Sequence, residues 1–242
     1  MSSFDYLESF ADEYYLNKNV ADIDIENIMQ ETSIEHITSK IKSDKNILEL
    51  GIGTGNIINY FSKKNISLDV LEGSKKLIEH FNKYQKNHNY IHGLFEEFHP
   101  KKQYDTIFAL HVFEHVEDPN ELAEKMYNWL TPEGRLIVVV PNKNSYHRIL
   151  GKEMGLQDEL DDLSERDKLV GHLRVFGFEE LEEVFLKKNY TVEERFGFFL
   201  KTVSNNLMLN YPKNVLIGLN KISFELDPYH LGNIGLVLTK KY

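Results

Sequence analysis

The chain contains no cysteine among its 242 residues. This absence excludes disulfide bonds, a zinc site built from thiolates and a cysteine nucleophile. Proline is also scarce, with six residues, and no proline-rich or glycine-rich stretch marks a linker between domains. We therefore expect one domain that spans residues 1–242.

Long apolar runs and an excess of basic charge are missing as well. The longest apolar run, residues 136–140, is too short to cross a bilayer, and the first six residues lack the pattern of a signal peptide. Acidic residues outnumber lysine and arginine by 38 to 28, for a net charge of −10. Such a chain repels phosphate backbones. We expect a cytoplasmic protein with a small-molecule substrate, without nucleic-acid or membrane partners, as a monomer or homodimer.

Between residues 46 and 141, short apolar segments alternate with segments of helical periodicity. Strands are predicted over residues 46–50, 67–71, 89–92, 104–110 and 135–140, and helices over residues 56–63, 75–85 and 119–130. This alternation predicts an α/β architecture with a mostly parallel sheet.

The flanking segments differ from this pattern. Apolar residues three and four apart predict amphipathic helices in the first 40 residues. Beyond Pro141 we expect a polar, helical or mobile cover over residues 145–170, a helix over 178–188, a strand over 190–195, helical structure over 204–222 and a last strand over 235–240. The domain would divide into an N-terminal helical lid (1–42), a cofactor-binding half (43–141) and a substrate-side half with inserted helices (142–242).

A glycine-rich turn, residues 49–55 (ELGIGTG), follows the first predicted strand. Ligands of open α/β sheets bind where strands end, and glycines let the backbone approach them closely. Gly51, Gly53 and Gly55 recur at every second position, whereas the dinucleotide fingerprint would need its third glycine at Asn56. The spacing disfavours a pyrophosphate site. A tight strand-to-helix connection that binds no ligand remains an alternative interpretation of this turn.

Glu72 ends the second predicted strand, about 20 residues after the glycine turn, as expected for a side chain that accepts hydrogen bonds from a ribose. The alternative is a charge at a helix N-terminus, because Ser74 is suited to cap the following helix.

These motifs resemble the class I S-adenosylmethionine-dependent methyltransferase superfamily, in particular its small-molecule and ubiquinone-biosynthesis-like group. The matching segments occur in family order and spacing, at residues 49–55 (ELGIGTG), 70–74 (VLEGS), 104–108 (YDTIF), 111–119 (HVFEHVEDP) and 134–138 (GRLIV).

The resemblance implies a Rossmann-like sheet of seven strands, mostly parallel with the last strand antiparallel, and helices on both faces. It implies S-adenosylmethionine as the cofactor and S-adenosylhomocysteine as the product. Glu49 would orient the loop or the methionine amino group, and Glu72 would hold the ribose. The other cofactor-binding residues that we expect are Gly51, Gly53, Gly55, Gly73, Leu94, Phe95, Leu110, His111 and Tyr14.

The sequence indicates the residues that would bind the methyl acceptor less clearly. Methyl transfer needs a base only when the acceptor loses a proton, and histidine suits that role near neutral pH. His172, in a segment that resembles the family's His-x-Arg-x-Phe connection, is our first catalytic candidate, and His111 is the second. Arg174 could neutralise an anionic substrate, or pair with the acidic residues 158–162. The further substrate-side candidates are His115, Asn142 and His147, for which structural roles stay open.

We therefore expect methyl transfer to a small polar metabolite, as O-methylation of a sugar, a phosphorylated or an acidic intermediate. No metal is expected. Catechol-type enzymes bind magnesium through an aspartate after the fourth strand and a later Asp-Asn pair, whereas this chain has His111 and the isolated Asn142 at comparable places. A nicotinamide-dependent oxidoreductase and a non-catalytic cofactor-binding module are the alternatives.

Overall fold

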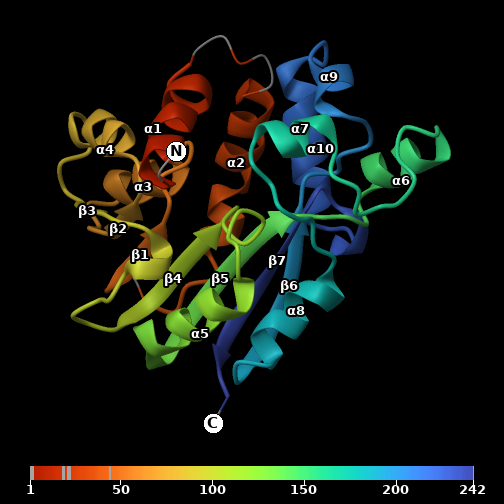
Figure 1. Cartoon of the computed structure of the whole chain (residues 1–242). Coiled ribbons are helices and arrows are strands. Elements are labelled where there is room, and N and C mark those ends of the chain that lie inside the picture. The colour runs from red at the N-terminus through yellow and green to blue at the C-terminus, as the bar shows by residue number, and fades with distance from the viewer. Residues whose placement is uncertain (1–2, 18–19, 21–22, 44, 242) are drawn as a thin grey trace.

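The computed structural model describes residues 3–17, 20, 23–43 and 45–241, and one seven-stranded sheet forms its centre (Figure 1). The strands are β1 (Ile47–Leu50), β2 (Asp69–Glu72), β3 (Asn89–His92), β4 (Tyr104–Leu110), β5 (Leu130–Pro141), β6 (Tyr190–Phe198) and β7 (Asn233–Lys240).

The strand order is β3-β2-β1-β4-β5-β7-β6. Strands β1 to β5 pair in parallel, and β7 runs antiparallel to both β5 and β6. The predicted sheet, with its last strand antiparallel, is confirmed. Because β1 pairs with both β2 and β4, the chain changes direction across the sheet beside β1. Ligands of open α/β sheets bind outside the carboxyl ends of the strands at such a switch point.

Helices cover both faces of the sheet, as predicted (Figure 1). Helices α5 (Pro119–Trp129) and α8 (Phe178–Leu186) contribute to the hydrophobic core on one face. Helices α2 (Ile23–Thr38), α3 (Asn56–Lys63), α4 (Lys75–Asn82) and α10 (Lys213–Ser223) contribute to the core on the other. The central strand β5 is inaccessible to solvent from Leu136 to Val140, which accounts for its unbroken apolar sequence.

Two helices begin where the sequence supplies a cap. The Asp118 carboxylate accepts hydrogen bonds from the backbone N–H groups of Asn120 (2.8 Å) and Glu121 (3.2 Å) ahead of α5, whose first residue is Pro119. The Ser74 hydroxyl accepts from the Leu77 N–H ahead of α4. Both caps lie at the edge of the sheet where the parallel strands end.

The remaining helical elements are short, and the helices among them lie on the side of the molecule toward which β4 and β5 point (Figure 1). They are α1 (Ser3–Phe10), the π-helical turn η1 (Ala11–Tyr15), the 3-10 turn η2 (Phe95–Glu97), α6 (Tyr146–Glu153), α7 (Glu165–Leu169), α9 (Asn205–Met208) and the 3-10 turn η3 (Pro228–His230). Residues 204–222, predicted as helical throughout, form two helices, because Pro212 lacks the N–H that would continue α9 and instead precedes α10. Among the described residues, no helix is both long and apolar enough to span a membrane.

Candidate active site

A cavity of about 790 Å³ opens at the carboxyl ends of β1, β2 and β4. This volume is typical of a small-molecule site. The predicted cofactor residues that line it are Glu49, Gly51, Gly53, Glu72, Gly73, Leu94, Phe95, Leu110 and His111. Of the predicted substrate-side residues, His115 lines it. No lysine or arginine contributes to its wall within the described part of the chain, whereas seven carboxylate side chains do: Glu49, Glu72, Glu96, Glu97, Glu117, Asp118 and Glu121.

The glycine turn gives the cavity its floor. Gly51 and Gly53 have φ angles of 77° and 53°, in the left-handed region that glycine adopts without steric cost. The Gly51 N–H donates to the Leu71 carbonyl (2.8 Å), which joins the turn to β2. Gly55 does not line the cavity. A Cβ atom there would lie 2.0 Å from the Phe81 ring, so this third glycine permits close packing against α4.

Glu72 connects the ends of β1 and β2. Its buried carboxylate accepts hydrogen bonds from the backbone N–H groups of Ile52 (2.8 Å) and Ser74 (2.7 Å). Burial raises the pKa of Glu72, although these N–H groups oppose the shift. Ser74 caps α4, as the alternative interpretation of Glu72 assumed. Glu72 also lines the cavity, so the structure contains both features.

Glu49 lies beside Glu72 in the same wall. It is 5% exposed, and its Oε2 atom is buried without a hydrogen-bond partner among the residues that the structure describes. Burial and the neighbouring charge of Glu72 raise the pKa of Glu49 well above its ordinary value. A positively charged or hydrogen-bond-donating ligand would relieve this electrostatic cost.

Helix α1 and turn η1 contribute Tyr6, Leu7, Phe10, Ala11 and Tyr15 to the wall of the cavity. The Glu8 carboxylate accepts hydrogen bonds from the Ser74 hydroxyl and the Lys75 N–H, both at 2.8 Å, and thereby holds α1 on the N-terminus of α4. Leu7 packs so closely on Gly73 that a Cβ atom there would lie 2.3 Å from its Cδ1. The function of residues 1–42 as a lid stays a prediction.

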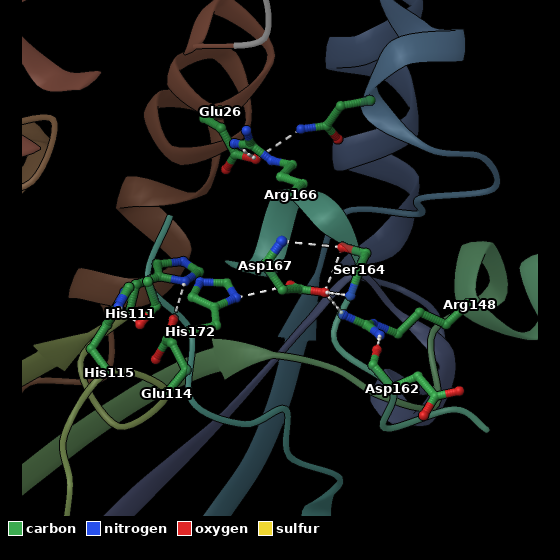
Figure 2. A network of polar contacts seen from close by, with 12 residues as sticks. Glu26, His111, Glu114, His115, Arg148, Asp162, Ser164, Arg166, Asp167 and His172 are labelled. Carbon is green, nitrogen blue, oxygen red and sulfur yellow. Dashed lines mark hydrogen bonds and ion pairs between the residues drawn. The ribbon is translucent and has the colours of Figure 1, made fainter. Parts of the chain in front are cut away.

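Tyr14, which we expected at the cofactor, does not line the cavity, whereas Tyr15 does. The Tyr14 hydroxyl accepts a hydrogen bond from Arg166 (2.7 Å), which lies on α7. Arg166 is also paired with Glu26, at 3.4 Å (Figure 2).

His111 follows β4 with a φ of 56°, an unusual backbone conformation for a residue with a side chain. Its Nδ1 atom is 3.2 Å from Oε1 of the fully buried Glu114, while its Nε2 atom is buried without a partner. Burial opposes protonation, but the hydrogen bond and charge of Glu114 raise the pKa of His111. Glu114 therefore orients the imidazole, as carboxylates do for catalytic histidines.

His172 does not line the cavity, and its ring points toward Asp167 (Figure 2). Its Nδ1 atom is 2.8 Å from Oδ1 of Asp167, and its ring meets that of His115 edge-on at 4.9 Å between centroids. Asp167 was not predicted as a functional residue. The spacing of Ser164 and Asp167 is that of a capping box, which the structure contains, but that pattern does not predict the contact with His172.

Arg174 does not line the cavity and does not pair with residues 158–162. Its guanidinium donates to the backbone carbonyls of Phe113 (3.2 Å), Glu117 (3.1 Å) and Val116, and so braces the turn after β4. The acidic segment is contacted by Arg148 instead, which donates to the Asp162 carbonyl (2.9 Å). This geometry favours a structural role for Arg174.

Asn142 and His147 also lie outside the cavity wall. The buried Asn142 amide donates to the carbonyls of Tyr229 (2.8 Å) and Leu231 (2.9 Å) and so ties β5 to the loop before β7. His147 contacts the Ser145 hydroxyl (2.9 Å), and burial lowers its pKa well below the ordinary value. A role of either residue at the substrate stays a prediction that this geometry does not favour.

Comparison with known proteins identifies the family. The family model described as a methyltransferase domain matches residues 27–195. The chain therefore belongs to the methyltransferase domain family. This result confirms the class I resemblance and, with it, S-adenosylmethionine as the cofactor predicted for the family.

Individual relatives are distant. A ubiquinone biosynthesis O-methyltransferase of Rickettsia felis is 27% identical over 128 residues, which are 49% of this chain and 52% of that protein. A malonyl-[acyl-carrier protein] O-methyltransferase of Ilyobacter polytropus is 26% identical over 179 residues, 69% of this chain and 68% of that protein. The match thus spans about half the length of the Rickettsia relative.

Among solved structures, the fold resembles that of a Haloferax volcanii complex between the Trm112 methyltransferase activator and a putative methyltransferase. The TM-score is 0.67 at 15% identity, with 98% of both chains covered. At this identity the likeness concerns the fold.

Proposed function

We propose that this chain transfers the methyl group of S-adenosylmethionine to an oxygen atom of a small, uncharged, hydroxyl-bearing molecule. The observation that carries this proposal is the electrostatic character of the cavity. Glu49 and Glu72 meet at the glycine turn, and no lysine or arginine lines the described wall. Such a site favours a cationic ligand and repels an anionic one.

The residues present fit the cofactor. S-adenosylmethionine carries a sulfonium and an ammonium group, and when bound it supplies a methyl group that is already activated for displacement. The unpartnered Oε2 atom of Glu49 supports a role in accepting a hydrogen bond from the ammonium group. Glu72 would hold the ribose hydroxyls, and Leu94 and Phe95 would contact the adenine. Gly51 and Gly53 would let the backbone approach the cofactor.

The acceptor that we expected from the sequence needs adjustment. A cation would favour a phosphorylated or acidic acceptor, and Arg174, which supported that expectation together with several histidines after the fifth strand, is bound to backbone carbonyls outside the cavity. Tyr6, Phe10, Val116 and Leu173 supply an apolar wall instead. A neutral acceptor with an apolar portion fits this wall, and a sugar stays a candidate. The relatives that methylate oxygen agree with an oxygen nucleophile.

The contribution of the protein is positioning and proton removal. Holding an acceptor oxygen in line with the methyl group lowers the barrier without covalent catalysis. His111 is the proposed base, because Glu114 fixes its Nδ1 atom while Nε2 has no hydrogen-bond partner among the described residues. Helix α1 and turn η1 would exclude water from the site.

The proposal is tested by incubating the purified chain with S-adenosylmethionine and a library of hydroxyl-bearing metabolites, and by measuring S-adenosylhomocysteine release. His111→Gln should lower turnover about 10²–10⁴-fold with the best acceptor, a much larger loss than any change in its binding of S-adenosylhomocysteine. His80→Gln, on the exposed part of α4, is the matched control. Tight cofactor binding without turnover on any acceptor would instead indicate a binding module.

A further inference from the structure

Three side chains with metal-binding atoms, Glu114, His115 and His172, lie close together beside the cavity (Figure 2). Glu114 and His115 come from the turn after β4, and His172 comes from the segment after α7. One potential ligand atom from each lies within 4.8 Å of the other two. Segments almost 60 residues apart in the sequence therefore converge on one point.

Both imidazoles are anchored through the same ring nitrogen. Nδ1 of His172 is 2.8 Å from the Asp167 carboxylate, and Nδ1 of His115 is 3.2 Å from the Gly171 carbonyl. Because both partners are hydrogen-bond acceptors, the proton of each neutral ring belongs on Nδ1. Each Nε2 atom then carries a lone pair, as metal coordination requires.

Glu114 supplies an independent observation. The residue is 0% exposed. Its Oε1 atom contacts His111, whereas its Oε2 atom is buried without a hydrogen-bond partner in the described part of the chain. An orphaned carboxylate oxygen in a protein interior is costly. A cation bound beside it would remove that cost.

A second layer of contacts holds His172 in place. Oδ2 of Asp167 accepts hydrogen bonds from Arg148 (2.5 Å) and from the Ser164 N–H (2.9 Å), while Oδ1 faces His172. The Arg148–Asp167 ion pair is almost inaccessible to solvent. A carboxylate that orients a histidine in this way is the usual support of a metal-ligating imidazole. The polar segment 145–170 thereby gains a specific task, since it carries both Arg148 and Asp167.

We propose that Glu114, His115 and His172 bind one divalent transition-metal ion such as Zn²⁺. Two imidazoles and one carboxylate suit such ions better than Mg²⁺. Ligand distances of about 2.1 Å would require the three side chains to draw together by about 1 Å. This differs from our expectation from the sequence, where no metal site was predicted.

The position of the ion suggests what it does. Three protein ligands leave a coordination position open, and His115 also lines the cavity, flanked by Val116 and Gly171. If the chain methylates a hydroxyl, as proposed above, the ion binds that oxygen and lowers its pKa. This second step rests on the proposed function, whereas the binding of the ion does not.

The test is titration of the untagged, metal-free, full-length chain with Co²⁺ and Zn²⁺, followed by calorimetry and by the visible absorption of Co²⁺. We expect one equivalent of either ion to bind, with Mg²⁺ at least tenfold weaker. Glu114→Gln and His172→Ala should each weaken binding by about 100-fold or more, and Asp167→Asn by about 10–100-fold. His80→Ala should change nothing.

Failure of the wild type to bind Co²⁺ or Zn²⁺, or unchanged binding in both Glu114→Gln and His172→Ala, would overturn the proposal. If the buried Glu114→Gln variant does not fold, His172→Ala and the wild-type titration decide. S-adenosylhomocysteine binding, measured separately on the same samples, distinguishes the two claims. Cofactor binding without metal binding refutes the metal site alone, and metal binding without cofactor binding refutes the proposed function alone.

Discussion

The change of Glu72 to glutamine tests the cofactor site most informatively, because it keeps the shape of the side chain and removes its charge. Each carboxylate oxygen already accepts one backbone N–H, from Ile52 at 2.8 Å and from Ser74 at 2.7 Å, and retains a lone pair for a ribose hydroxyl. In Glu72→Gln an NH₂ group replaces one oxygen, so one backbone N–H loses its acceptor and the hydrogen bond to the ribose is no longer made by a charged group.

The expected magnitude follows from that loss. A hydrogen bond to a charged group contributes about 1.5–3 kcal/mol, which corresponds to about 10–150-fold weaker binding of S-adenosylhomocysteine. Isothermal calorimetry measures the effect, with Glu79→Gln on the exposed face of α4 as the matched control. Thermal unfolding of the same samples reports how far the turn itself is destabilised. Binding by Glu72→Gln within about twofold of the wild type would refute the ribose role.

Three further predictions concern Glu49, Gly55 and Arg174. Because burial raises the pKa of Glu49 above 4.5, its contribution to stability is present below that pH and is lost as pH rises through the raised value. Glu49→Gln should therefore raise the melting temperature of the ligand-free protein at neutral pH and weaken cofactor binding. Equal melting temperatures at pH 7 would contradict this. Gly55→Ala should lower the free energy of unfolding by about 2–4 kcal/mol, measured by chemical denaturation. Gly155→Ala should lower it by only about 1 kcal/mol, because Gly155 has a φ of 70° but no described atom within 4 Å of the added Cβ. Equal losses would refute the packing argument. Arg174→Lys should lower stability by about 1–3 kcal/mol; a raised KM at unchanged stability would instead show that Arg174 binds the acceptor.

Sequence patterns predicted the positions of the strands well because the apolar patterning of a buried strand is local, whereas the seven-stranded sheet with an antiparallel last strand was implied by the family resemblance. The apolar run of β5 indicated a strand covered on both faces, and residues 136–140 are indeed inaccessible. The spacing of about 20 residues between the glycine turn and Glu72 is set by one strand–helix–strand unit, so the sequence contains it directly. The positive φ angles of Gly51 and Gly53 follow from the same turn.

The acceptor side could not be predicted in the same way, since its contacts join distant segments. Nothing near Arg174 in the sequence indicates that its guanidinium donates hydrogen bonds to the carbonyls of a turn about 60 residues earlier. The docking of Glu8 on Ser74 is a contact across 66 residues. The pairing of Asp167 with His172 is close in sequence, but the direction of both side chains depends on Arg148 and on the packing of α7. Such contacts are properties of the folded chain.

Calorimetric titration of the wild-type chain with S-adenosylhomocysteine, in parallel with NAD⁺, tests the central claim most directly. The acidic cavity at the glycine turn predicts saturable binding of S-adenosylhomocysteine with a stoichiometry of one and no measurable binding of NAD⁺. Binding of NAD⁺ in preference to S-adenosylhomocysteine, or the absence of S-adenosylhomocysteine binding to the folded protein, would contradict it.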